Sequence, residues 1–121
     1  MRPVPTLLHG LVDYAWGAVL LAAPRALGFG RDPAADALAR VAGAGAILYA
    51  VLTDYELGAV PLISMETHLK LDLAGGALLA APLLLGGSDR TWKPHLAFGA
   101  LAVAAGLMTR KTPYGRPDRA A

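Results

Sequence analysis

The feature that most constrains the fold is a duplicated apolar segment that carries a histidine and an aspartate four residues apart. The stretch His9-Gly-Leu-Val-Asp13 recurs as His68-Leu-Lys-Leu-Asp72, and each copy is followed by the string Leu-Leu-Ala-Ala-Pro. This duplication indicates two copies of one supersecondary unit. Because side chains four residues apart share one face of a helix, each copy places its histidine beside its aspartate.

The composition indicates a membrane protein. Of the 121 residues, 55% are hydrophobic and 17% are charged, whereas soluble domains carry about 25% charged residues. A small domain has a large surface, and this chain lacks the polar residues to cover it. The chain has no cysteine, which excludes disulfides and thiolate chemistry, and its net charge of +2 is too small to indicate a nucleic-acid partner.

Four apolar segments have nearly the length of a membrane-spanning helix. They cover about residues Thr6–Leu27, Ala34–Tyr55, Ile63–Leu85 and Trp92–Arg110, with glycine and proline residues between them. The short connections make neighbours antiparallel. Repeat 1 therefore covers about residues 6–57, repeat 2 covers about residues 63–113, and a basic tail covers residues 110–121.

The predicted fold class is all-α, a four-helix transmembrane bundle of two tandem parallel helical-hairpin repeats in a single domain over residues 1–121. Since each repeat has two helices, both repeats enter the membrane from the same side, with a pseudo-two-fold axis along the membrane normal. The basic tail suits an anionic cytoplasmic lipid surface. We therefore expect an integral protein of the cell inner membrane with both termini in the cytoplasm.

The repeats resemble the SPW-repeat family of small bacterial-type membrane proteins, in which each repeat has two transmembrane helices and a Ser-Pro-Trp motif closes the first. The matching positions are Ala23-Pro24-Arg25 followed by Leu27-Gly28-Phe29, and Ala81-Pro82-Leu83 followed by Gly86. Each copy retains only the proline of the motif, so the resemblance rests on repeat length, topology and proline–glycine spacing over nearly the whole chain. It implies a fold and no particular activity.

The polar residues of the predicted spans gather at one end of the bundle. The expected cluster consists of His9, Asp13, Asp54, His68, Asp72 and Arg110. A charge near the bilayer centre costs about 2.5–3.5 kcal/mol, so both deep aspartates need partners. Glu66 and Lys70 form a second pair four residues apart, which at 100° per residue points away from the histidine and aspartate of the same helix.

Three interpretations of the duplicated pair remain open. In the first, the pairs bond each other and lock the helices together, as in a non-enzymatic protein of structural or assembly type without a cofactor. In the second, they line the proton path of a proton-coupled channel or transporter. In the third, His9, Asp13, His68 and Asp72 bind a divalent metal, or the two histidines bind haem. The expected partners are the lipid bilayer and further copies of the chain in a homo-oligomer.

Other residues are expected to have structural roles. Small residues such as Gly43 and Gly76 allow helices to approach closely in lipid. Ser64 is expected to cap the N-terminus of a helix. His95 and Tyr55 are expected at the membrane–water interface.

Overall fold

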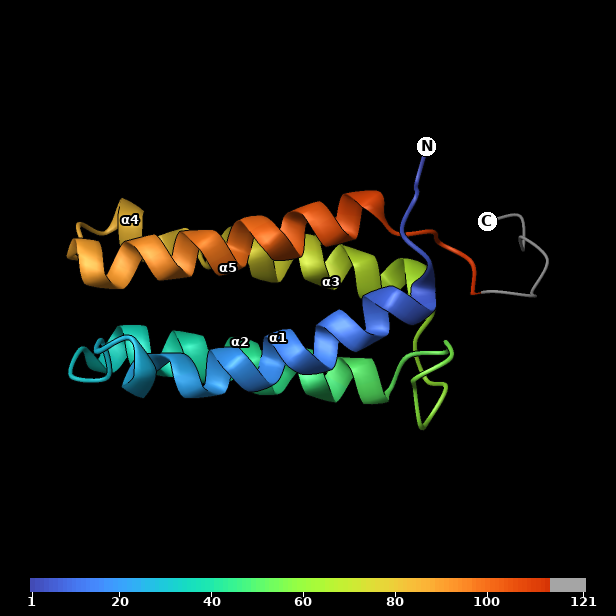
Figure 1. Cartoon of the computed structure of the whole chain (residues 1–121), viewed down its shortest axis with the longest axis horizontal. Helices are drawn as coiled ribbons and strands as arrows, with labels where there is room; N and C mark the ends of the chain where they lie inside the picture. Colours follow the sequence, from blue (N-terminus) through green and yellow to red (C-terminus); the bar gives the residue numbers. More distant parts are fainter. Residues whose placement is uncertain (114–121) are drawn as a thin grey trace.

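The computed structural model describes residues 1–113, which form two antiparallel helical hairpins (Figure 1). The first hairpin consists of α1 (Thr6–Ala26) and α2 (Pro33–Val51). The second consists of α3 (Met65–Leu78), the short α4 (Ala81–Leu84) and α5 (Asp89–Met108). The N-terminus, the α2–α3 connection and the end of α5 lie together at what we call the terminal end; the two remaining hairpin connections form the loop end (Figure 1).

The all-α prediction is confirmed for residues 1–113, in which the non-helical pairing is limited to two isolated β-bridges. By length and composition, α1 and α2 are suited to cross a membrane. Residues 114–121, which make up most of the predicted basic tail, lie outside the described part of the chain.

Local sequence signals set the helix ends. Asp32 caps α2 and Ser64 caps α3, each accepting a hydrogen bond from the backbone N–H three residues ahead. The capping role expected for Ser64 is therefore confirmed. Gly28 and Gly86 follow the proline of each repeat by four residues and adopt φ angles of 78° and 76°, a left-handed conformation that favours glycine.

The third predicted helix is divided, and Pro82 lies in the first turn of the second piece, where its missing backbone N–H costs no hydrogen bond. The single helix expected to reach Leu85 is instead divided into α3 and α4. Leu20 and Leu79, which are 59 residues apart, are both fully buried. The repeats thus stay in register up to Leu79. Pro24 and Pro82 are only 58 residues apart, so repeat 2 lacks one residue at the break between α3 and α4.

Close contacts between glycines hold each hairpin together. Gly17 of α1 faces Gly43 of α2, and Gly76 of α3 faces Gly99 of α5. A methyl group at Gly43 would lie 2.7 Å from the carbonyl oxygen of Gly17, and one at Gly76 would lie 2.7 Å from that of Gly99. The small-residue packing expected from the sequence is confirmed at these positions.

Contacts between the hairpins are much sparser than those within them. Near the middle, the indole Nε1 of Trp16 donates a hydrogen bond of 3.1 Å to the carbonyl oxygen of Phe98, and the two rings meet edge to face. Leu20 and Leu79 pack in one apolar cluster with these rings. The densest set of polar contacts between the hairpins lies toward the terminal end.

Candidate functional site

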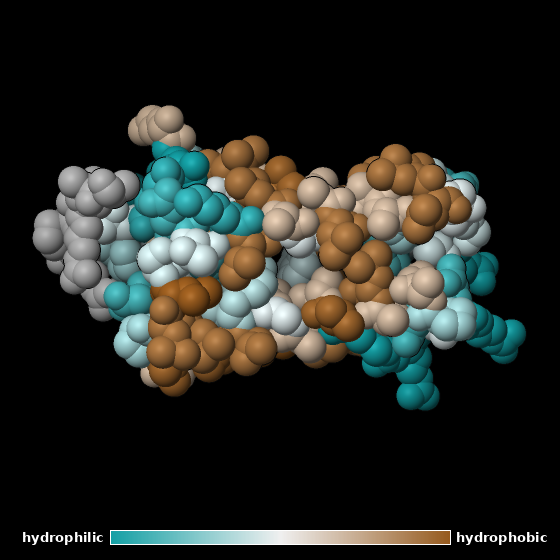
Figure 2. Space-filling view, turned by 180° about the vertical axis from the view of Figure 1, so that it is seen from behind, coloured by the Kyte–Doolittle hydropathy of each residue, from teal (hydrophilic) through white to brown (hydrophobic). Residues whose placement is uncertain are grey.

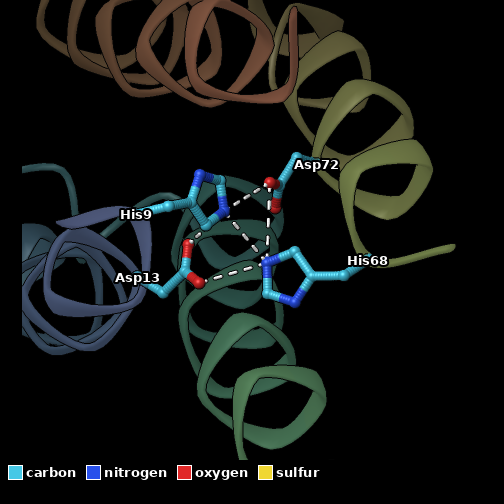
Figure 3. Close-up of side chains that lie close together, drawn as sticks. All are labelled: His9, Asp13, His68 and Asp72. Atoms are coloured by element: carbon cyan, nitrogen blue, oxygen red, sulfur yellow. Dashed lines mark hydrogen bonds and ion pairs between the residues drawn. The ribbon is translucent and has the colours of Figure 1, made fainter. Parts of the chain in front are cut away.

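Four buried titratable side chains from the two hairpins converge toward the terminal end (Figure 3). His9 and Asp13 project from α1, and His68 and Asp72 project from α3; their exposed fractions lie between 0% and 7%. On each helix the pair lies on the inward face, one turn before the glycine that contacts the neighbouring helix. We call these four residues the His–Asp centre.

The contacts of the His–Asp centre cross between the hairpins. His9 Nε2 lies 3.1 Å from Asp13 Oδ1 and 3.0 Å from Asp72 Oδ2. His68 Nε2 lies 3.1 Å from Asp13 Oδ2 and 3.6 Å from Asp72 Oδ2. The two Nε2 atoms are 3.1 Å apart (Figure 3). The expected pairs within each helix are present, but the nearest carboxylate to each histidine belongs to the other hairpin.

The outer nitrogen of each histidine is also held by the other hairpin. His9 Nδ1 lies 2.7 Å from Thr109 Oγ1, at the end of α5, and His68 Nδ1 lies 2.7 Å from Thr53 Oγ1, just after α2. Both threonines are at most 1% exposed. Thr53 and Thr109 are 56 residues apart, as are Asp54 and Arg110, so the two threonines are equivalent in the two repeats. Their role was missed because only the fold brings them to the histidines.

The hydroxyl hydrogen of Thr53 determines the tautomer of His68. Thr53 Oγ1 donates its single hydrogen to the backbone oxygen of Tyr49. The same oxygen must therefore accept a hydrogen from His68 Nδ1. In the neutral ring, Nε2 of His68 then carries a lone pair, and this lone pair is directed into the His–Asp centre.

Two tyrosines of the first hairpin hold the carboxylates. The Tyr49 hydroxyl donates a hydrogen bond of 2.7 Å to Asp72 Oδ1, and the Tyr55 hydroxyl donates one of 3.1 Å to Asp13 Oδ2. Tyr55 is only 5% exposed, so its expected place at a membrane interface is wrong. Each of the four residues of the centre thus has a partner outside it.

One oxygen of the centre lacks a hydrogen-bond donor among residues 1–113. Asp72 Oδ2 lies 3.0 Å from His9 Nε2, but no N–H or O–H is directed at it. Buried polar atoms are hydrogen-bonded in the large majority of cases, and leaving one unsatisfied costs about 1–3 kcal/mol. The centre therefore contains an acceptor that the described protein groups leave unused.

The other predicted polar residues lie outside the His–Asp centre. Glu66 and Lys70 form an exposed ion pair of 3.5 Å, and Lys111 lies 3.5 Å from the same carboxylate. Asp54 is half-buried and Arg110 is exposed. Asp54 follows α2, and its backbone N–H donates a hydrogen bond to the segment before α3. Arg110 follows α5, and its backbone N–H donates one to the segment before α1. Both residues therefore lie beyond the centre.

A third buried histidine lies toward the loop end. His95 is 1% exposed, with Nδ1 2.7 Å from the backbone oxygen of Thr91 and Nε2 3.1 Å from that of Ala35. Its ring also packs against Phe29. The interface position expected for His95 is therefore wrong, because the ring is in the core and connects α5 to α2.

Comparison with protein families finds a match that spans both hairpins. The family model described as SPW repeat domain covers residues 7–109. Comparison with curated proteins and with solved structures finds no match.

Proposed function

The chain belongs to the SPW repeat family, as its repeats suggested, and from this premise we propose that it is a non-enzymatic integral membrane protein of structural type. In this proposal all the long helices cross the bilayer as one four-helix bundle. The His–Asp centre joins its two hairpins. The crosswise bonding of each histidine to a threonine of the other hairpin is the observation that carries the proposal.

The outward-facing side chains support a bilayer location. Large apolar residues are exposed along every long helix, among them Leu11, Leu48, Leu71 and Leu101. Figure 2 shows apolar surface over much of one face, with hydrophilic residues toward the two ends. Soluble monomers rarely expose extensive apolar surface, whereas lipid tails can cover it. The second hairpin runs alongside α1 and α2, which supports four spans (Figure 1).

Polar contacts are well placed to hold the hairpins together in lipid. Without water around the helices, the hydrophobic effect does not drive the two hairpins together, so packing and hydrogen bonds decide their association. Contacts between the hairpins are otherwise few. Separating them would take Thr109 from His9, Thr53 from His68 and Tyr49 from Asp72, in a medium that supplies no replacement.

The core gives less support to a proton-coupled channel or transporter. Among residues 1–113, the buried polar side chains lie either around the His–Asp centre or around His95. Between these groups pack Leu20, Leu79 and the rings of Trp16 and Phe98. A proton path needs polar groups or water along its length, so transport remains the alternative. The cytoplasmic placement of both termini and a homo-oligomeric state remain predictions.

Unfolding of the purified protein in detergent tests the structural proposal. Asp13→Asn and Asp72→Asn should each lower the free energy of unfolding by about 1.5–3 kcal/mol, because each replaces a buried carboxylate that accepts a tyrosine hydrogen bond and contacts the histidine of the other hairpin. Glu66→Gln, which neutralises an exposed carboxylate on the same helix as Asp72, is the matched control and should change it by less than about 0.5 kcal/mol.

A metal chelator in all samples keeps bound metal from contributing to these values. The structural proposal fails if the two asparagine variants unfold as the unaltered protein does. Proton flux in liposomes, measured on the same variants, addresses the alternative: flux that depends on Asp13 and Asp72 in a stable protein would establish transport instead.

A further inference from the structure

We propose that the His–Asp centre binds one divalent transition-metal ion, with Zn²⁺ as the ion that its donor atoms suit best. The ligands are Nε2 of His9, Nε2 of His68 and one carboxylate oxygen each from Asp13 and Asp72. The inference rests on the proposed function in that the ion would join the same two hairpins. It extends that proposal by naming a ligand, and it can fail separately.

The spacing of the donor atoms fits a tetrahedral site. Ligands at 2.0–2.2 Å from a tetrahedral Zn²⁺ lie about 3.3–3.6 Å from one another. The two Nε2 atoms are 3.1 Å apart, and the contacts of Nε2 with carboxylate oxygens measure between 3.0 and 3.6 Å. All four ligand atoms lie within 4.8 Å of one another. The most widely separated pair would have to close by up to about 1.2 Å, the difference between 4.8 and 3.6 Å, to reach tetrahedral spacing.

The hydrogen bonds around the centre prepare its atoms for a cation. A metal-binding histidine usually donates its other ring N–H to an acceptor, which fixes the tautomer and the ring orientation. His68 does so through Nδ1 to Thr53, and His9 Nδ1 lies at the same distance, 2.7 Å, from Thr109. The carboxylates are oriented in turn by the hydroxyls of two tyrosines.

The charge of the centre also favours a divalent ion. With both imidazoles neutral, the two carboxylates carry a charge of −2 inside the bundle, which a divalent cation neutralises. Protonating both rings would also neutralise it, but two imidazolium rings with Nε2 atoms 3.1 Å apart repel each other strongly in a low dielectric. A divalent metal ion supplies the same charge of +2 at one point, and the Nε2 lone pairs of both histidines bind it.

The unsatisfied oxygen is an independent sign of a missing cation. Asp72 Oδ2 is buried, faces His9 Nε2 at 3.0 Å and receives no hydrogen bond from the described residues. His9 Nε2 and Asp72 Oδ2 are close enough to bind one metal ion together, with the ion in place of any hydrogen on that nitrogen. The ion would therefore satisfy the atom that the protein leaves without a donor.

The surroundings of the centre bear on the kind of ligand it can hold. The void between the two carboxylates, lined in part by Trp16 and Tyr49, has a volume of about 10 Å³, which is room for one water at most. A wider groove of about 290 Å³ between α2 and α3 reaches Asp72 from outside. Four protein ligands without an open position are typical of structural metal sites. Haem held by both histidines would have its macrocycle between the two rings, where the carboxylates of Asp13 and Asp72 lie against both Nε2 atoms.

Metal titration of the detergent-solubilised full chain tests this inference. After treatment with chelator, the protein should bind one Zn²⁺ per chain in competition with a chromophoric chelator. Co²⁺ in its place should show the intense visible bands of tetrahedral coordination. In Asp72→Asn the affinity for Zn²⁺ should fall by more than about 100-fold, because loss of an outer partner alone costs 10–100-fold. Glu66→Gln should bind Zn²⁺ as the unaltered chain does.

The two proposals give separable outcomes. Failure of the folded, unaltered chain to bind Zn²⁺ saturably overturns the metal inference, as does equal affinity in an Asp13→Asn, Asp72→Asn double variant. If the double variant does not fold, the decision rests on the unaltered chain: Co²⁺ bands without tetrahedral intensity, or X-ray absorption without imidazole ligands, also overturn it. If the centre stabilises the bundle in the presence of chelator but binds no Zn²⁺, the structural proposal stands and the metal inference fails.

Discussion

Gly76→Ala adds one methyl group at the closest approach of α3 and α5. The new Cβ would lie 2.7 Å from the carbonyl oxygen of Gly99 and 2.9 Å from Cγ2 of Val103, where ordinary contact begins at 3.4 Å. The carbonyl belongs to the α5 backbone and cannot rotate away. The helices must therefore separate by up to about 0.7 Å, which is the difference between 3.4 and 2.7 Å.

Gly75 provides the matched control, because a Cβ at this adjacent position has no neighbour within 4 Å. Alanine favours a helix over glycine by about 0.5–1 kcal/mol at either position. Overpacking of a tight contact costs about 1–3 kcal/mol and applies only at Gly76. Because the helix preference cancels, the free energies of unfolding of the two variants should differ by about 1–3 kcal/mol, with Gly75→Ala the more stable.

Reversible unfolding in mixed detergent and denaturant, followed by helical circular dichroism, measures this difference. The first hairpin offers a repetition of the experiment, since Gly43 approaches Gly17 as closely while Gly45 faces open space. Equal stability of the Gly75→Ala and Gly76→Ala variants would refute the reasoning, because it would mean that α3 and α5 do not meet at Gly76.

Three further substitutions test single contacts. Thr53→Val should destabilise the bundle by about 1–3 kcal/mol, because His68 loses the acceptor for its Nδ1–H; the exposed Thr67→Val is its control, and equal effects in unfolding would contradict the tautomer assignment. Tyr49→Phe should weaken Zn²⁺ binding 10–100-fold without unfolding the protein, and unchanged affinity in a competition titration would contradict its role in orienting the carboxylate. His95→Leu should cost about 1–3 kcal/mol in thermal or chemical unfolding, and no loss would mean that its contact with the backbone oxygen of Ala35 does not join the hairpins.

The repeated sequence predicted the helices that carry the centre and the pairing within each helix. A four-residue spacing is a local property, so the placing of His9 beside Asp13 follows from helical geometry alone. The crosswise contacts depend on how two hairpins pack, which spacing along one helix does not determine. Thr53 and Thr109 were aligned by the repeat, but a threonine at a helix end has many local roles.

The repeat gave no indication of the roles of Tyr49 and Tyr55. The position in repeat 2 that corresponds to Tyr49 is Ala105, and the one that corresponds to Tyr55 is Lys111. An aromatic residue near the end of an apolar segment is typical of a membrane interface, and this typical role was assigned to Tyr55. Its burial follows from the chain after α2, which turns back over the end of the bundle and brings the ring beside His68.

The crosswise bonding has a consequence for the origin of the chain. A single hairpin of this kind cannot complete the centre, because its histidine needs the threonine of a second hairpin. Two identical hairpins related by a two-fold axis can complete it, so a homodimer of one repeat is a sufficient ancestor. Joining the copies in one chain replaces association in the membrane with a tethered contact at an effective concentration of about millimolar order. After that fusion the halves could differ within one chain, as they do in the two tyrosines that the first repeat alone supplies.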